Sequence, residues 1–198
     1  MKILVVGASG VLGSAVVAEL GARHDIIRAG RSGADLAIDI TDIASIRAAF
    51  AKLGTVDAVV STTGKVKFAP LAALSAEDYG IGLADKLMGQ VNLVLIGRPH
   101  LSERGSFTLT SGILGHDPIV AGSSASMVNG AIDSFVRAAA IELVPQRINA
   151  VSPGVLVESM DDYGPFFRGH EPVPAARAAR AFAKSVEGAL TGQVMSVI

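Results

Sequence analysis

The 198-residue sequence contains no cysteine and no tryptophan, and its positive and negative charges nearly balance. Without cysteine there is neither a disulfide framework nor a thiolate nucleophile, so we expect a cytoplasmic protein in a reducing environment. The net charge of −1 and the scattered Lys and Arg residues argue against nucleic acid or an anionic membrane as partner. No uncharged apolar run reaches the roughly 18–20 residues of a membrane span. We therefore expect a soluble protein that acts on a small molecule.

Hydrophobic residues make up half of the chain, and only 18% of its residues are charged. This balance, at a mass of 20.2 kDa, suits one domain with a large core. We find no internal repeat and no linker, so residues 1–198 are predicted to form a single dinucleotide-binding domain.

The first thirteen residues, MKILVVGASGVLG, carry the clearest motif. The apolar residues 3–6 predict a buried strand, and Gly7, Gly10 and Gly13 follow at steps of three before residues 14–20 continue with helical spacing. Strand, glycine turn and helix in this order form the context of a dinucleotide-binding fingerprint. Glycine lets backbone N–H groups approach a phosphate, and the helix N-terminus faces it with partial positive charge.

Strand-like and helix-like segments alternate along the rest of the chain. The predicted strands are residues 3–6, 25–29, 36–40, 57–61, 106–111, 147–151 and 193–197. The predicted helices are residues 14–20, 41–52, 75–97 with interruptions at Gly80 and Gly82, 124–143 and 174–186. Residues 155–173 show no period and predict a mobile substrate loop or flap. The alternation predicts an α/β, Rossmann-like, doubly wound fold with a seven-stranded parallel sheet and helices on both faces.

Several motifs, in this order, resemble those of the short-chain dehydrogenase/reductase family. They are GASGVLG at the first turn, Asp39, STTG at 61–64, TSG at 110–112, RINAVSPG at 147–154 and TGQV at 191–194. The resemblance covers nearly the whole chain and implies a nicotinamide cofactor. It also implies a homodimer or homotetramer that pairs through the helix at 124–142 and the long helix before it.

The choice of cofactor depends on the end of the second strand. An acidic residue there would accept hydrogen bonds from a ribose 2′-hydroxyl, but this chain has Arg31 and Ser32. A guanidinium with a neighbouring hydroxyl favours a 2′-phosphate, so we predict NADP(H) rather than NAD(H). The alternative is that Arg31 is only a solvated loop charge. Asp39 resembles the family position beside the adenine, with a helix cap as its alternative.

The predicted cofactor contacts lie at the ends of several strands. They are Gly7, Ser9, Gly10, Val11, Leu12, Gly13, Arg31, Ser32, Asp39, Ile40, Thr62, Gly64, Pro153 and Gly154.

The family's catalytic residues match this chain at one position only. Ser111 stands where the family has the Ser that hydrogen-bonds the carbonyl, although a strand-end hydroxyl can equally satisfy the backbone. An ungapped alignment places Ser123 at the family's Tyr, Met127 at its Lys and Lys86 at its Asn. A serine hydroxyl is a poor general acid at neutral pH, and a thioether carries no proton, so Met127 is interpreted as helix packing.

Three residues are candidates for the missing acid. Lys86 would act if it points into the pocket with a pKa lowered by burial, and otherwise it is a surface lysine. His116 follows Ser111 in a loop, where an exposed histidine is the alternative. Tyr163 lies in the predicted flap, where its ring would otherwise simply pack. The other histidines show no spacing typical of a metal site, and we expect none.

Two functions remain open on this basis. The first is an NADP(H)-dependent oxidoreductase that acts on a small carbonyl or alcohol, in which Ser111 orients the carbonyl and Lys86, Ser123-held water or a loop residue supplies the proton. The second is a catalytically weak NADP(H)-binding sensor or regulatory protein.

Overall fold

The computed structural model describes all 198 residues and contains one seven-stranded sheet, in which every strand pair is parallel. The strand order is β3-β2-β1-β4-β5-β6-β7, which is the doubly wound arrangement that the alternation of strands and helices predicts. The strands are β1 (Lys2–Val6), β2 (Asp25–Gly30), β3 (Leu36–Ala37), β4 (Val56–Ser61), β5 (Leu101–Thr110), β6 (Arg147–Pro153) and β7 (Val194–Val197).

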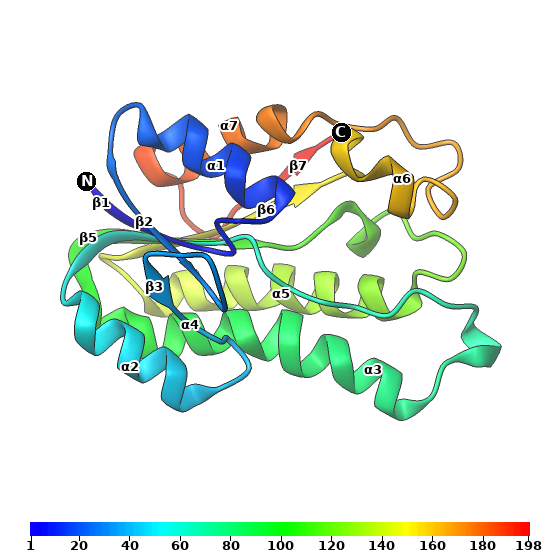
Figure 1. Cartoon of the computed structure of the whole chain (residues 1–198), viewed down its shortest axis with the longest axis horizontal. Coiled ribbons are helices and arrows are strands. Elements are labelled where there is room, and N and C mark those ends of the chain that lie inside the picture. Colours follow the sequence, from blue (N-terminus) through cyan, green and yellow to red (C-terminus); the bar gives the residue numbers. More distant parts are fainter.

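Helices cover both faces of the sheet (Figure 1). The α-helices are α1 (Val11–Gly21), α2 (Ile43–Leu53), α3 (Ala76–Gly82), α4 (Gly89–Gly97), α5 (Ser123–Glu142), α6 (Met160–Tyr163) and α7 (Ala175–Glu187). Short 3₁₀ turns are η1 (Leu71–Ala73), η3 (Arg98–His100), η4 (Ile113–Gly115) and η5 (Val157–Ser159), and η2 (Leu83–Met88) is a π-helix. Helices α1 and α7 lie on one face, and α2, α4 and α5 lie on the other.

Successive side chains of a strand point to opposite faces of the sheet, so the apolar strands contribute to a hydrophobic core on each face. In β1, Leu4 and Val6 belong to the core under α2, α4 and α5, whereas Ile3 and Val5 belong to the core under α1 and α7. All four side chains are essentially inaccessible to solvent. A strand buried on both faces reads as a continuous apolar run, which is why the N-terminal segment was recognisable from sequence.

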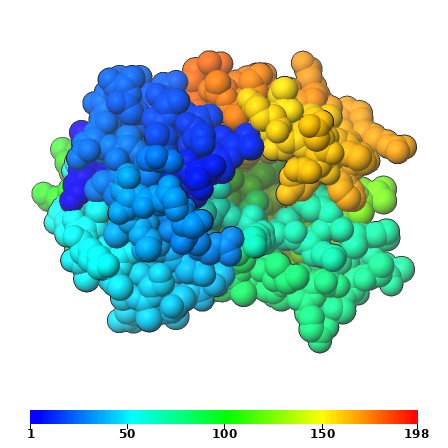
Figure 2. Space-filling view, in the orientation of Figure 1, coloured from blue at the N-terminus to red at the C-terminus, as the bar shows by residue number.

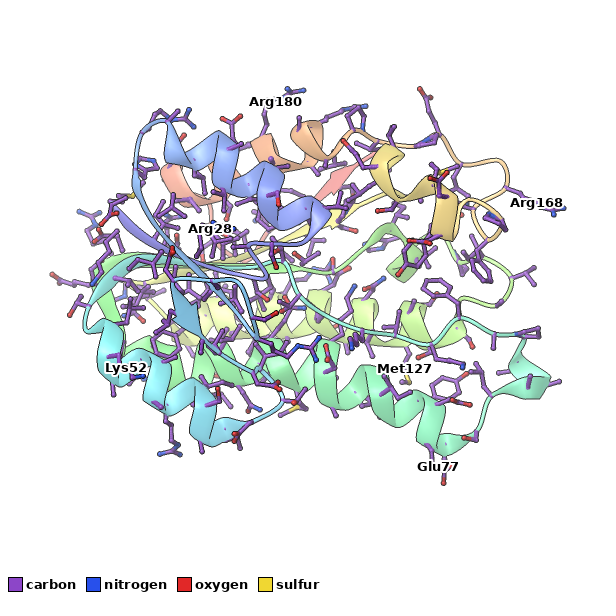
Figure 3. All side chains as sticks on the ribbon, in the orientation of Figure 1. Arg28, Lys52, Glu77, Met127, Arg168 and Arg180 are labelled. Atoms are coloured by element: carbon purple, nitrogen blue, oxygen red, sulfur yellow. The ribbon has the colours of Figure 1, made fainter.

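Helix α7 shows how a helix of modest hydrophobicity is fixed to the sheet. Its sequence AARAARAFAKSVE buries one stripe that includes Phe182 and Val186 and leaves Arg177, Arg180 and Lys184 outside. Figure 3 shows Arg180 pointing away from the molecule. The small alanines let this helix approach the sheet and α1 closely, and the long stems of the basic residues keep their charges in water.

The elements differ from the predicted ones mainly at their ends. The third strand is only Leu36–Ala37, because Asp39 turns the chain through hydrogen bonds to Thr41 instead of continuing the ladder. Helix α1 begins at Val11, inside the glycine motif, and β5 begins five residues earlier than predicted. The long helix at 75–97 is regular through Gly80 and Gly82, and its irregular part is the π-helix at Leu83–Met88.

The predicted flap, residues 155–173, carries η5 and α6 and packs on the sheet's carboxyl edge. Leu156 pairs with Val173 in a short parallel bridge, and Phe167 is buried in a small separate cluster with Ile113 and Val155. Whether this segment opens remains a prediction. Among all the helices, none combines the length and apolar character that crossing a membrane would need.

Candidate active site

Two cavities lie at the carboxyl ends of the strands, where ligands bind in open parallel sheets. Figure 2 shows this face hollowed between the blue N-terminal segments, the cyan-green segment and the yellow-orange flap. The first cavity has a volume of about 300 Å³. Its walls are Val6, Gly7, Ser9, Gly10, Gly30, Arg31, Ser32, Ile38, Asp39, Ile40, Thr62, Thr63, Gly64, Lys65 and Asp85.

The glycine turn forms the floor of this first cavity. Gly7 has a φ of +86°, a backbone conformation that L side chains rarely adopt. A Cβ on Gly13 would lie 2.0 Å from the carbonyl oxygen of Gly7, so strand and helix meet here with no room for any side chain. Gly10 caps α1 without a side-chain hydrogen bond, and the first turn contains no acidic residue. The backbone N–H groups in the first turn of α1, which have no acceptor within the helix, therefore remain available to an anion.

The rim of the first cavity carries the groups expected to read the ribose. Arg31 and Ser32 are exposed on the wall directly after β2, and Arg31 forms no ion pair. The Asp39 carboxylate accepts hydrogen bonds from the N–H and hydroxyl of Thr41, at 2.9 and 2.7 Å. These bonds, together with the nearby positive charge of Arg31, hold the pKa of Asp39 below its usual value. The cap of α2 is Asp42, so Asp39 keeps the cavity position that the family resemblance implies.

Not every predicted cofactor residue faces the first cavity. Gly7, Ser9, Gly10, Arg31, Ser32, Asp39, Ile40, Thr62 and Gly64 line it. The first cavity is not lined by Val11, Leu12 or Gly13. These three residues form the first turn of α1, where they can offer a ligand their backbone N–H groups. Pro153 and Gly154 line the second cavity instead. Sequence reasoning missed Lys65, an exposed cation on the wall that no motif marks.

The second cavity adjoins the first at Gly64 and has a volume of about 210 Å³. Half of its lining residues are hydrophobic. The walls are Gly64, Val66, Phe68, Lys86, Thr110, Ser111, Gly112, Ile113, Leu114, Ala125, Asn129, Pro153, Gly154, Val155, Leu156, Ser159, Tyr163 and Phe167. Ser111, Lys86 and Tyr163, three of the predicted candidates, therefore meet here from β5, η2 and α6.

Lys86 and Ser111 are in direct contact. The Lys86 ammonium donates a hydrogen bond of 2.9 Å to the Ser111 carbonyl oxygen, and the stem of Lys86 packs so closely on Gly64 that a Cβ there would lie 2.5 Å from its Cγ. The Ser111 hydroxyl is buried and has no hydrogen-bond partner in the protein. A buried hydroxyl without a partner, on a residue that lines a cavity, is a group that a bound ligand would satisfy.

Buried Gln90 holds the two elements that carry these groups in place. Its amide nitrogen donates to the carbonyl oxygens of Lys86 and Thr110, at 3.1 and 2.9 Å, and its oxygen accepts from the Thr110 N–H at 2.9 Å. Gln90 thus ties the π-helix to the end of β5. The relative position of Lys86 and Ser111 depends on this clamp.

Burial lowers the pKa of Lys86 to about 8, against an attraction to the Asp133 carboxylate that acts in the opposite direction. Taking an ammonium out of water favours its neutral form, which is the direction of the shift. At neutral pH the lysine is still mostly protonated, and it loses its proton more easily than an exposed lysine. A positioned acid with this pKa is suited to proton transfer near physiological pH.

The structure does not place Ser123 at the site. Its hydroxyl lies 2.8 Å from the Tyr79 hydroxyl, in a different hollow beside Ile119 and Val120. Met127 is 41% exposed on α5 (Figure 3), which also leaves it outside both cavities. The positions of α5 that face the second cavity with the same four-residue spacing are Ala125 and Asn129. The ungapped alignment places Ser123 and Met127 at the site, whereas Ala125 and Asn129, each two residues further along α5, line the cavity.

Ala125 and Asn129 are the residues that sequence reasoning missed on α5. Asn129 is buried, and its side-chain oxygen has no hydrogen-bond partner. A buried Asn beside Val128 and Ile132 was the available signal, although Ser124 and Asp133 are buried on this helix too. Sequence reasoning also missed Phe68 and Phe167, because aromatic residues in loops carry no motif.

His116 lies outside both cavities. Its ring nitrogen Nε2 is 3.1 Å from a carboxylate oxygen of buried Asp133, and its side chain is 47% exposed. The loop position predicted from sequence is therefore correct, but the ring pairs with α5 and does not line the site.

Comparison with known proteins assigns the family. The family profile described as enoyl-(acyl carrier protein) reductase matches residues 7–197. The chain is a member of the short-chain dehydrogenase/reductase family. It is 32% identical over 133 residues to the short-chain dehydrogenase/reductase ATR9 of Stachybotrys chlorohalonatus, covering 65% of this chain and 51% of the relative. It is 33% identical over 115 residues to elsinochrome reductase 1 of Elsinoe fawcettii, covering 57% and 43%. The matches thus span about half the length of these curated relatives.

Solved structures extend the likeness over the whole chain. The crystal structure of the protein lin1944 from Listeria innocua is 52% identical, with full coverage of both chains and a TM-score of 0.98. A small-chain dehydrogenase solved in complex with NADPH shares the fold at 23% identity, with a TM-score of 0.89 and coverage of 100% of this chain and 96% of that one. The family is one of oxidoreductases that use a nicotinamide cofactor, and the glycine cradle without room for a Cβ fits such a group.

Proposed function

We propose that this protein is an NADP(H)-dependent oxidoreductase that interconverts a small carbonyl compound and its alcohol. The proposal rests on one juxtaposition, a protonated Lys86 and the unpartnered Ser111 hydroxyl in a cavity that adjoins the nucleotide cleft. The family assignment supplies the class of reaction, and the side chains in the cavity supply the chemistry.

The preference for NADP(H) is argued from the end of β2. Arg31 is free of any internal ion pair, and the residues directly after β2 are Arg31 and Ser32, where an acidic residue would bind a ribose 2′-hydroxyl. The nearby Asp39 carboxylate already accepts hydrogen bonds from Thr41. A guanidinium binds a phosphate dianion through charge-assisted hydrogen bonds. Lys65 adds a second positive charge on the same cavity wall.

In the second cavity, one residue orients the substrate and another donates the proton. When bound, the reduced nicotinamide supplies a hydride to the carbonyl carbon. The Ser111 hydroxyl donates a hydrogen bond to the carbonyl oxygen and orients it, and the Lys86 ammonium gives that oxygen a proton as negative charge develops on it. Lys86 is left as a neutral amine and regains its proton from solvent. In this proposal Lys86 replaces the acid that Ala125 and Asn129 cannot provide, since neither side chain titrates.

Single-turnover hydride transfer tests this assignment. With NADPH bound and a panel of small aldehydes and ketones, we expect Lys86→Met to slow the transfer by about 10²–10⁴-fold, the usual contribution of a positioned proton donor. Ser111→Ala should slow it as well, and both variants should bind NADPH as the parent does. Ser123→Ala is the matched control and should change nothing. Equal rates for Lys86→Met and the parent would remove Lys86 from the mechanism.

One observation favours a second function. The cavity-facing positions of α5 carry no ionisable group, so a protein that binds NADP(H) without turnover, as a sensor or regulatory partner, would look the same in the nucleotide cleft. Tight NADPH binding with no reduction of any carbonyl above the buffer rate selects this alternative.

We also propose that the chain assembles as a homodimer or homotetramer. Exposed apolar side chains follow η2 and α4 and recur on α5, and they are Leu83, Met88, Leu95, Met127 and Ile141. Burying such side chains between copies is favourable by roughly 25 cal/mol per Å² of apolar surface. Light scattering at micromolar concentration should give a dimer or tetramer, and a monomer would contradict the assignment.

A further inference from the structure

The second cavity has one wall made of aromatic rings. Phe68 comes from the loop after β4, Tyr163 from α6 and Phe167 from the flap, and all three line the cavity. The ring centroid of Phe68 is 5.5 Å from that of Tyr163, at an interplanar angle of 67°, and 6.4 Å from that of Phe167. Phe68 therefore contacts both other rings, Tyr163 edge-to-face and Phe167 at a tilt of 54°. Such a wall offers a flat ring the offset and edge contacts that aromatic rings prefer.

Another part of the cavity lining is polar and carries a single charge. Lys86 is the only ionisable group there apart from the Tyr163 phenol, and it forms no ion pair within the protein. One of its three hydrogens is used by the Ser111 carbonyl oxygen. The buried Ser111 hydroxyl and the buried Asn129 oxygen, both on this wall, are also without partners. A partly buried cation with donors to spare is stabilised by an anion placed against it.

We propose, on the basis of the function given above, that this cavity selects a small flat ring bearing an anionic oxygen. The oxygen is a carboxylate or an ionised enol or phenol hydroxyl that accepts one of the two remaining Lys86 hydrogens, and the other hydrogen stays available to the carbonyl oxygen. The ring lies against Phe68, Tyr163 and Phe167. A volume of about 210 Å³ is below the 300–1,000 Å³ common for drug-sized ligands. The cavity therefore suits one small ring system.

The walls select against the other ligand classes. An organic cation would meet the Lys86 ammonium with no carboxylate on the lining to balance it. A neutral ring would contact the aromatic rings and leave the ammonium without an anion inside the cavity, with only the Ser111 carbonyl oxygen and the attraction to Asp133 to stabilise it. An aliphatic acid would pair with Lys86 and leave the aromatic wall without a ring to contact. The aromatic rings and Lys86 act together only on an aromatic or otherwise planar anion.

Calorimetry with four simple probes tests the selection. We expect benzoate to bind at least tenfold more tightly than acetate, benzyl alcohol or benzylamine, in the presence of NADPH. Equal affinity for acetate and benzoate would overturn the ring assignment, and equal affinity for benzyl alcohol and benzoate would overturn the anion assignment. Absence of benzoate binding would overturn both. NADPH binding is titrated separately, so failure of the nucleotide site and failure of this cavity give different results.

Substitutions of Lys86 test whether benzoate binds in this cavity. Lys86→Met should weaken benzoate binding about tenfold or more while leaving benzyl alcohol unaffected, and Lys86→Arg, which keeps the charge, should retain most of it. Lys67→Met is the matched control, because Lys67 is an exposed lysine on the loop after β4, next to Phe68, and lines neither cavity. If Lys67→Met and Lys86→Met weaken benzoate equally, the anion does not bind at Lys86.

A second pair of variants tests the aromatic wall. Tyr163→Leu should weaken benzoate several-fold and leave acetate unchanged. Phe166→Leu is its control, since Phe166 packs against Phe68 with centroids 5.3 Å apart but does not line the cavity. Thermal unfolding of each variant confirms that it is folded. An equal loss in both variants, or none in Tyr163→Leu, would show that the ring contacts do not select the ligand.

Discussion

The two cavities lie side by side at Gly64 and differ in how the sequence encodes them. The nucleotide cleft is built on backbone, with the turn at Gly7 and the open start of α1 as its floor. The second cavity is built from side chains that come from the loop after β4, η2, β5, α5 and the flap. A backbone site is specified by residues a few positions apart, whereas a side-chain site depends on where the fold brings distant segments together.

This difference explains which predictions succeeded. Glycine at Gly7 and Gly13 is required by geometry that any chain with this turn must satisfy, so spacing alone identifies it. Nothing comparable marks Phe68, Asn129 or Phe167, since each is an ordinary residue until the fold places it on a common wall. The chemistry of a member of this family can therefore change at the second cavity while the first stays recognisable.

The largest effect on stability and on nucleotide binding is expected in the glycine turn, which has no room for a side chain at Gly13. Gly13→Val puts side-chain atoms where even a Cβ lies 2.0 Å from the Gly7 carbonyl oxygen. We expect a loss of stability of about 3 kcal/mol or more by overpacking, together with loss of NADPH binding. Thermal unfolding and NADPH titration measure both. Gly130→Ala is the control, because no neighbouring atom lies within 4 Å of its Cβ position, and helix propensity predicts a gain of up to about 1 kcal/mol.

The pH dependence of carbonyl reduction tests the second cavity. Since burial lowers the pKa of Lys86 to about 8, the ammonium is present below that pH and is lost above it. The rate constant for reduction should therefore be level below about pH 8 and fall about tenfold per pH unit above it. The reverse oxidation, which needs the neutral amine, should rise over the same range. Lys86→Met should remove this pH dependence. If the reduction rate of this variant still falls above about pH 8, the fall is caused by a group other than Lys86.

A smaller effect is expected at the rim of the nucleotide cleft. Arg31→Ala should weaken NADPH by about 10–150-fold, the 1.5–3 kcal/mol of a hydrogen bond to a charged group, and leave NADH within about threefold. Parallel titrations of the two nucleotides give the ratio. Arg28→Ala, in the preceding strand and outside both cavities (Figure 3), serves as the control. If Arg31→Ala weakens both nucleotides alike, the arginine does not read the 2′-phosphate.

The smallest change in reduction rate is expected for Tyr163→Phe, a variant that distinguishes Lys86 from Tyr163 as the proton donor. Tyr163→Phe removes only a phenol hydroxyl, in a side chain that is 41% exposed and has a ring in contact with Phe68. We expect the rate of reduction to change less than about twofold, because the ring contacts are kept. A loss of a hundredfold would transfer the role of proton donor from Lys86 to Tyr163.

Most of the fold could be predicted from periodicity. Strands buried on both faces read as apolar runs, and helix α7 carries a clear amphipathic pattern. The shortness of β3 could not be foreseen, because it depends on a side-chain turn at Asp39 that competes with the ladder. The π-helix at Leu83–Met88 was missed for a similar reason, since its residues are ordinary helix formers.

Within the site, Lys86 and Ser111 could be found because they stand beside family motifs. Ser123 was placed at the site by an ungapped alignment, which does not give the rotation of the helix that carries it. Only the orientation of α5, fixed by the packing of Ile132 and Val136 into the core, decides that Ala125 and Asn129 face the cavity. That packing is a property of the whole chain and not of any short segment.

The π-helix gives this site a point of mechanical sensitivity. The N–H of Gly89 is shared between the Ala84 carbonyl oxygen, five residues back, and the Asp85 carbonyl oxygen, four residues back, so the wider turn of η2 ends at Gly89. Deleting a single residue from this turn would let a regular helix form. The Lys86 ammonium would then rotate off the wall it shares with Ser111, and the protein would keep its fold and its nucleotide cleft while its reactive cation faced elsewhere.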